Sequence, residues 1–168
     1  HKTKMFSLDN TYSVDELMEW HKRVCKGLSN QPVEYVVELK IDGISATLTY
    51  EHGRFVLGAT RGDGTNGEDI TQNLKTVRSV PLTLKKSEKR GIPEILDVRA
   101  EIYMNRKDFE SLNKERKNAE ETLFANPRNA TSGALKLLDT RITPQRKLNC
   151  LVFIVRLQHT VNNTKSLK

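Results

Sequence analysis

A lysine flanked by two carboxylates is the strongest candidate for covalent chemistry in this chain. Lys40 comes two residues after Glu38 and two residues before Asp42. A free lysine amine has a pKa of about 10.4, so it becomes a nucleophile at neutral pH only where burial or neighbouring cations lower that pKa. The same residues also fit an ordinary ion pair on a solvated surface. The spacing alone therefore leaves both readings open.

The residues before Lys40 indicate how this group would be positioned. Apolar side chains occupy every second position of residues 33–40, at Val33, Tyr35, Val37 and Leu39. This alternation predicts a half-buried strand, with Glu38 and Lys40 pointing to the same side. Residues 44–50 and 55–60 alternate in the same way and are separated by short turns. We therefore expect three consecutive antiparallel strands, with Lys40 at the end of the first.

The remaining patterns predict an α+β fold, with antiparallel sheets and helices packed outside them. Residues 96–103 alternate, which places Glu101 on the polar face of another strand. Ser13 and Glu16 have the spacing of a capping box at the start of a helix. We also expect a helix after Asn105, a short helix through residues 135–138 and a closing strand over 150–155.

Composition narrows the class of protein. The chain has 168 residues, enough for one domain with a real core. Its two cysteines, Cys25 and Cys150, have no partners at zinc-site spacing, and no apolar run is long enough to span a membrane. These features predict a cytoplasmic protein without membrane contact.

Charge is distributed unevenly along the chain. Residues 1–74 carry 8 Lys and Arg against 11 Asp and Glu, a balance of −3, while residues 75–168 carry 20 against 10, a balance of +10. A basic half of this size favours a polyanionic partner such as nucleic acid, although cations on solvated helix faces give the same count.

Residues 40–43, Lys-Ile-Asp-Gly, resemble the adenylate-accepting motif of the covalent nucleotidyltransferases, which include DNA ligases, RNA ligases and messenger-RNA capping enzymes. Almost the whole chain is more specifically similar to the adenylation domain of bacterial-type NAD-dependent DNA ligases. The segments that carry this resemblance occur in the same order and are residues 5–10, 38–43, 58–64, 67–71, 98–101 and 124–130.

The resemblance implies the covalent nucleotidyltransferase fold and a defined reaction. The lysine that matches Lys40 attacks the α-phosphate of NAD, keeps AMP as a phosphoramidate and passes it to the 5′-phosphate of nicked double-stranded DNA. The 3′-hydroxyl then displaces AMP and the nick is sealed, which would serve DNA replication and repair. Mg²⁺ is expected to accompany this phosphoryl chemistry on the phosphates, with no metal held by protein ligands alone.

The resemblance also assigns roles to individual residues. Asp42 is expected to orient Lys40, and Arg128 and Lys136 are expected to contact phosphates of DNA or AMP. Lys136 stands where an arginine is more common, which weakens the expectation of a bidentate contact there. The residues expected to hold the nucleotide are Ser7 and Leu8 along the adenosine, Glu38 at the adenine amino group, Arg61 near ribose and phosphate, Glu101 at the ribose hydroxyls and Phe153 stacked on adenine.

The match is incomplete at both ends. The chain begins after the small domain that recognises nicotinamide mononucleotide in this family, and it ends before two later lysine-bearing motifs. We therefore expect residues 1–157 to be the N-terminal portion of an adenylation domain, with a polar tail or linker at 158–168. The chain would then be a monomeric fragment with negligible ligation activity by itself.

Two alternative functions stay open: an ATP-dependent nucleotidyltransferase, and a non-catalytic basic module that binds nucleic acid.

Overall fold

The computed structural model describes residues 5, 9–29, 31–86, 91–137 and 143–158. These residues fall into two compact units. One unit consists of the described residues within Phe6–Lys40. The other contains Met5 and the described residues from Ile41 onward. Within the described part of the chain, no helix is long and apolar enough to cross a membrane.

The unit within Phe6–Lys40 is built on helix α1, Val14–Gly27. The hydroxyl of Ser13 caps the helix by accepting from the amide of Glu16 at 3.1 Å. The Glu16 carboxylate returns to the amide of Tyr12 at 2.6 Å, one residue before the position that a standard capping box uses. The predicted start of the helix is therefore confirmed. Tyr35 packs against this helix, with its ring centroid 5.2 Å from that of Trp20.

The strand predicted over 33–40 is wrong. Residues 31–42 form neither helix nor strand. Val36, Val37 and Leu39 are between 86% and 94% exposed, so this segment has no buried face. Alternation shows only which side chains a neighbouring strand or layer could cover, and none of the described strands pairs with this segment. Lys40 and Glu38 are consequently exposed residues of an extended segment, and Lys40 does not end a buried strand.

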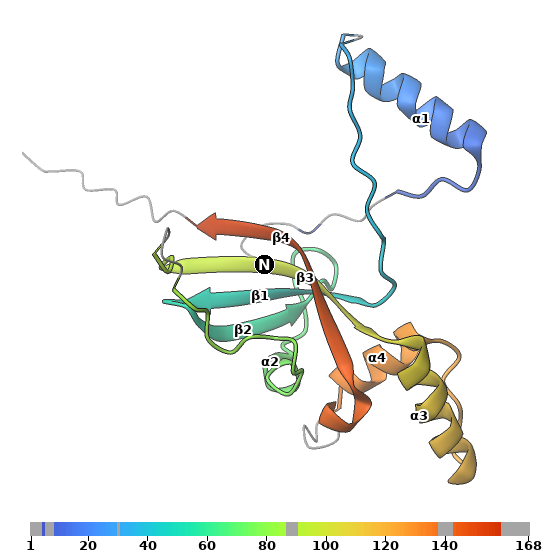
Figure 1. Ribbon diagram of the computed structural model, residues 1–168, viewed down its shortest axis with the longest axis vertical. Coiled ribbons are helices and arrows are strands. Elements are labelled where there is room, and N and C mark those ends of the chain that lie inside the picture. Colours follow the sequence, from blue (N-terminus) through green and yellow to red (C-terminus); the bar gives the residue numbers. More distant parts are fainter. Residues whose placement is uncertain (1–4, 6–8, 30, 87–90, 138–142, 159–168) are drawn as a thin grey trace, which may run out of the picture. The chain divides into compact units, whose positions relative to one another are not determined.

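The other unit is organised by one antiparallel sheet in the order β2-β1-β3-β4. Its strands are β1 (Ile44–Glu51), β2 (Arg54–Thr60), β3 (Ile95–Met104) and β4 (Leu148–Gln158). They include the predicted strands at 44–50, 55–60, 96–103 and 150–155, which are therefore confirmed. The helices α2 (Thr71–Leu74), α3 (Arg106–Asn118) and α4 (Pro127–Leu135), with a 3₁₀ turn at Thr143–Arg146, complete the predicted α+β class (Figure 1).

The two faces of the sheet differ in character because side chains alternate along each strand. One face is apolar and forms the core with α2, α4 and Leu112 of α3. Its largest fully buried side chains include Leu48, Ile102, Leu74 and Leu135. The opposite face carries polar, half-buried side chains at alternate positions, which are Ser45, Thr47 and Thr49 of β1 and Asp97, Arg99 and Glu101 of β3. The core thus fixes which residues of β1 and β3 are left to face a ligand.

Gly43 lies at the start of β1, where the chain passes very close to β3. It is buried, and a Cβ atom at this position would overlap the carbonyl oxygen of Ile102. That oxygen belongs to the backbone of a central strand, so it has little freedom to move away. The glycine of the Lys-x-Asp-Gly motif is therefore also a packing requirement of the sheet.

Replacing Gly43 with alanine is expected to lower the free energy of unfolding by about 1–3 kcal/mol, because the added methyl group overpacks a backbone contact. Gly91→Ala is the matched control in the same unit, since nothing lies within 4 Å of a Cβ atom there. Urea unfolding followed by circular dichroism measures both variants. Equal midpoints for Gly43→Ala and Gly91→Ala would contradict the close approach.

Tyr50 gives the fold a defined response to high pH. Its side chain is buried, its hydroxyl donates to the carbonyl of Pro81 at 2.9 Å, and burial raises its pKa from 10.0 to about 12. The folded state therefore holds the phenol proton where the unfolded chain has lost it. This contribution to stability is complete below pH 10 and is lost as the pH rises toward about 12.

The urea midpoint is accordingly expected to fall between pH 10 and about 12. The decline should be shallower in Tyr50→Phe, which has no phenol to ionise. Absorbance of tyrosinate at each pH reports the ionisation directly. An unchanged pH dependence in Tyr50→Phe would show that this side chain does not control the alkaline transition.

Candidate functional site

The polar face of the sheet carries matched side chains on its two central strands. In the register of β1 and β3, Ser45 stands opposite Glu101 and Thr49 opposite Asp97. Both pairs are joined by hydrogen bonds in which the hydroxyl donates to the carboxylate, at 2.5 Å from Ser45 and 2.7 Å from Thr49. The predicted placement of Glu101 on the polar face of a strand is therefore confirmed.

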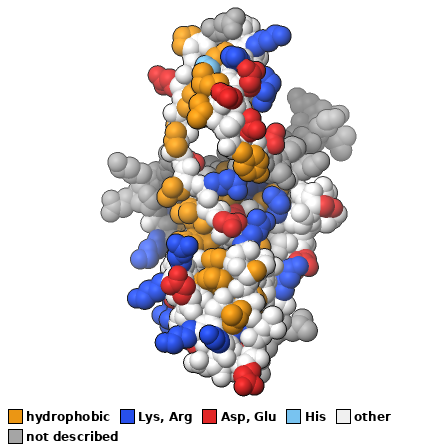
Figure 2. All heavy atoms as spheres, turned by 90° about the vertical axis from the view of Figure 1, so that its right-hand side faces the viewer, with side chains coloured by type: hydrophobic (Ala, Val, Ile, Leu, Met, Phe, Trp, Pro, Cys, Tyr) orange, Lys and Arg blue, Asp and Glu red, His pale blue; other side chains and the backbone are white. Residues whose placement is uncertain are grey.

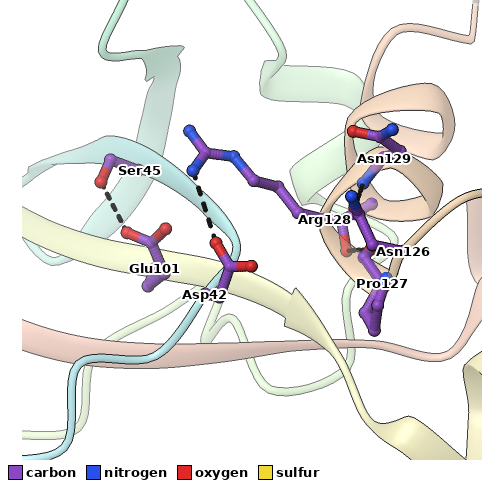
Figure 3. Close-up of polar contacts among 8 residues, drawn as sticks. Asp42, Ser45, Glu101, Asn126, Pro127, Arg128 and Asn129 are labelled. Carbon is purple, nitrogen blue, oxygen red and sulfur yellow. Dashed lines mark hydrogen bonds and ion pairs between the residues drawn. The ribbon is translucent and has the colours of Figure 1, made fainter.

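Glu101 has one oxygen engaged and one available. Ser45 donates to Oε2, and the described residues give Oε1 no hydrogen bond (Figure 3). On the other side of β3, the residue opposite Glu101 is Leu151 of β4, which offers no polar group from its side chain. An ionised carboxylate accepts hydrogen bonds only, so Oε1 is suited to a hydroxyl or amine of a ligand.

Met5 and the loop after β2 border this face. The Thr47 hydroxyl contacts the sulfur of Met5 at 3.3 Å, and the amide of Met5 donates to the carbonyl of Gly64 at 2.9 Å. The amide of Arg61 donates to the carbonyl of Ser45 at 3.0 Å, which places the backbone of Arg61 next to the Ser45–Glu101 pair. The loop that begins at Arg61 is thus attached to the sheet at the candidate site.

The turn of this loop is held by backbone conformation and by one carboxylate. Gly62 and Gly64 have φ values of 55° and 92°, in the region that favours glycine. The Asp63 carboxylate accepts from the amides of Thr65 at 2.7 Å and Asn66 at 2.6 Å. These bonds stabilise the charged form and hold the pKa of Asp63 below its usual value.

Helix α4 presents a cation at its N-terminal turn and has another directly after its last residue. Asn126 caps the helix by accepting from the amide of Asn129 at 2.8 Å, and Pro127 occupies the first turn. Arg128 reaches Asp42 at 3.4 Å (Figure 3), and Lys136 reaches Glu68 at 2.8 Å. All four side chains are at least half exposed, so both ion pairs are weak and open to exchange with another anion.

The C-terminal end of α4 is fixed by Asn73 of α2. The buried side-chain amide of Asn73 donates to the carbonyl of Leu137 at 2.9 Å and to the hydroxyl of Thr143 at 3.1 Å. That hydroxyl donates in turn to the carbonyl of Ala134 at 3.2 Å. Carbonyls at the end of a helix need such partners, so Asn73 helps to hold the segment that carries Arg128 and Lys136.

Within the unit that contains the sheet, the structure brings some of the predicted site residues together. Asp42 and Arg128 form an ion pair, and the backbone of Arg61 lies next to Ser45, the partner of Glu101. Phe153 lies in β4 at the bulge opposite Arg99 and Ala100 and is 48% exposed. Glu38 and Lys40 belong to the other compact unit, where both are exposed. Ser7 and Leu8 lie outside the described residues.

Sequence reasoning missed three residues of this arrangement: Ser45, Glu68 and Asn73. Ser45 could have been found only with the pairing of β1 and β3, because it is 56 residues from Glu101. Glu68 pairs with Lys136 across 68 residues, and Asn73 reaches Leu137 across 64. Contacts of this range leave no periodic signal in the sequence.

Charge on the unit is mixed on the side that carries α3 and α4. There, lysine and arginine side chains lie among scattered acidic and apolar ones and do not form one continuous basic patch (Figure 2). Ion pairs between Arg106 and Glu110 and between Arg116 and Glu121 belong to this side. Among the described residues there is also no group of three His, Cys, Asp or Glu side chains that could hold a metal ion.

The fold and site define an α+β domain whose sheet carries two hydroxyl–carboxylate pairs on its polar face. Comparison with protein families then identifies it: residues 1–168 match the NAD-dependent DNA ligase adenylation domain, and the chain belongs to that family. It is 53% identical over 155 residues to a DNA ligase of Pseudothermotoga lettingae, 52% identical over 155 residues to one of Thermotoga neapolitana and 51% identical over 153 residues to one of Brevibacillus brevis. The alignments cover 91–92% of this chain and 22% of each relative, so the chain spans about a fifth of the length of these relatives.

Asn73→Ala is expected to lower the free energy of unfolding by about 1–3 kcal/mol, because it leaves the Leu137 carbonyl and the Thr143 hydroxyl short of a buried partner. Gln72→Ala, at an exposed position of the same helix, is the control and should stay within about 0.5 kcal/mol of the parent. Chemical unfolding measures both variants, and hydrogen exchange of the α4 amides locates the loss. Unchanged protection of α4 in Asn73→Ala would contradict this anchoring role.

Proposed function

We propose that this chain is the nucleotide-accepting part of an NAD-dependent DNA ligase and that Lys40 is its nucleophile. The observation that carries the proposal is the family match over residues 1–168, which includes the Lys-Ile-Asp-Gly sequence at 40–43. The finer fold is then that of the covalent nucleotidyltransferases, with residues 1–157 as the N-terminal portion of the adenylation domain and 158–168 as a tail or linker.

The first chemical step forms one bond and breaks another. The unprotonated Nζ of Lys40 attacks the α-phosphorus of the AMP half of NAD, and an N–P bond forms. The bond from that phosphorus to the bridging oxygen breaks, and nicotinamide mononucleotide leaves with its phosphate. The amine loses its remaining extra proton to solvent or a nearby base, which leaves AMP on the lysine as a phosphoramidate.

The second and third steps use nicked double-stranded DNA as substrate. A 5′-phosphate oxygen attacks the phosphoramidate phosphorus, which returns the lysine amine and gives an adenylated 5′ end. The 3′-hydroxyl then attacks the DNA phosphorus, AMP leaves, and the nick is sealed. This activity would serve DNA replication and repair in the cytoplasm, and we propose a monomer acting on each nick.

The nucleotide-binding roles extend this proposal to individual residues. Glu101 would accept hydrogen bonds from the ribose hydroxyls, and the available Oε1 supports that role. Glu38 would accept from the adenine amino group, and its exposure leaves the carboxylate accessible. Ser7 and Leu8 would line the adenosine, Arg61 would contact ribose and phosphate, and Phe153 would stack on adenine with its exposed ring.

Arg128 and Lys136 would exchange their carboxylate partners for phosphates of DNA or AMP. Their pairs with Asp42 and Glu68 are exposed, so exchange costs little. Release of Arg128 would free Asp42, two residues after Lys40, to orient the lysine. Mg²⁺ bound mainly by substrate phosphates and water would shield the α-phosphate charge.

Intact-mass spectrometry tests the first step. After incubation with NAD and Mg²⁺, the full natural polypeptide that contains these residues should gain the mass of one AMP. Lys40→Ala should abolish the gain in mass, because the Lys-x-Asp-Gly motif occurs once in the 168-residue sequence. Lys26→Ala, at an exposed position of α1, is the control and should retain the gain.

The outcomes separate the candidate activities. Adduct formation with ATP and not with NAD would identify an ATP-dependent enzyme. DNA binding that persists in Lys40→Ala, with no adduct from either nucleotide in the parent, would identify a non-catalytic DNA-binding module. An adduct that survives in Lys40→Ala would place the nucleophile elsewhere.

A further inference from the structure

We propose that Ser45 is a positioning residue that holds the Glu101 carboxylate in the orientation needed to read the ribose hydroxyls of the bound nucleotide. This inference rests on the proposed function, since it assumes that Glu101 faces the ribose. Ser45 would then help to determine nucleotide specificity, although it is not one of the nucleotide-binding residues proposed above. The chemistry it recognises is the ribose diol of an adenine nucleotide.

The geometry of the pair supports the assignment. Ser45 and Glu101 are direct partners in the register of β1 and β3, so their side chains emerge side by side on the same face. The hydroxyl donates to Oε2 at 2.5 Å, which is the short distance typical of a hydroxyl bonded to a carboxylate. Both residues are half-buried, which limits the competition from water.

Of the two residues directly opposite Glu101 on the neighbouring strands, Ser45 is the polar one. The partner on the other side is Leu151 of β4. Without the serine hydroxyl, the flexible glutamate side chain would have no hydrogen bond within the described part of the chain to select one rotamer. Because ordering such a side chain costs free energy on binding, a bond already made in the free protein increases affinity.

The direction of the remaining oxygen gives the pair its specificity. With Oε2 occupied by a donor, Oε1 is the oxygen left to accept from a ligand. A ribose presents two hydroxyl donors, whereas a ligand lacking them leaves Oε1 without a partner. The effect of Ser45 should therefore appear only with nucleotides that carry the hydroxyl in contact with Glu101.

The chain offers a matched control on the same two strands. Thr49 and Asp97 form the same kind of hydroxyl–carboxylate pair at 2.7 Å, four residues along β1 from Ser45. At about 3.3 Å per residue, the two pairs are separated by roughly 13 Å along the strand. Thr49→Ala thus removes a comparable structural bond without changing the orientation of Glu101.

The test measures nucleotide affinity by calorimetry in the full natural polypeptide that contains these residues. The ligands are AMP, 2′-deoxy-AMP and 3′-deoxy-AMP, and the variants are Ser45→Ala, Ser45→Thr, Thr49→Ala and Glu101→Ala. We expect Ser45→Ala to weaken AMP binding about 3- to 10-fold, while Ser45→Thr, which keeps the hydroxyl, restores it. With the deoxy analogue whose missing hydroxyl contacts Glu101, the parent and Ser45→Ala should bind equally.

The controls distinguish failure of this inference from failure of the proposed function. If Glu101→Ala weakens AMP binding and Ser45→Ala does not, Glu101 reads the ribose without help and the positioning role is wrong. Equal losses in Ser45→Ala and Thr49→Ala, or a loss with every ligand, would indicate a structural role only and would also overturn it. If the parent binds no AMP, or Glu101→Ala has no effect, the nucleotide role of this face fails and the inference fails with it.

Discussion

The pairing of β1 with β3 is the constraint on which this structure depends. Its antiparallel register places Ala46, Leu48 and Tyr50 in the core opposite Ala100, Val98 and Leu96. The same register places Ser45 opposite Glu101 on the other face. A shift by one residue would exchange the two faces, so the apolar core that stabilises the domain also fixes the position of the carboxylate that we assign to the nucleotide.

Gly43 connects this constraint to the proposed chemistry. The residue lies where β1 begins and where the chain comes too close to Ile102 for any side chain. Asp42 directly precedes it and pairs with Arg128, which stands in the first turn of α4. The Lys-x-Asp-Gly motif therefore combines a backbone contact, an ion-paired carboxylate and the proposed nucleophile within four residues.

The sequence could predict elements whose partners are provided locally or by a core. The strands at 44–50 and 96–103 were predictable because each has one buried face, and the start of α1 was predictable because Ser13 and Glu16 act within one turn. Residues 33–40 show the limit of this reasoning, since Val37 and Leu39 alternate like a strand yet remain exposed. The pairs of Ser45 with Glu101 and of Asn73 with Leu137 depend on tertiary contacts and could not be predicted from local pattern.

The central claim is that Lys40 carries AMP while Glu101 accepts the ribose. An experimental structure of the full natural polypeptide after reaction with NAD tests it most directly. We expect continuous density from Nζ of Lys40 to a phosphorus atom, with a ribose hydroxyl within about 2.6–3.2 Å of Oε1 of Glu101. AMP bound without a link to Lys40, or a ribose placed away from Glu101, would contradict it.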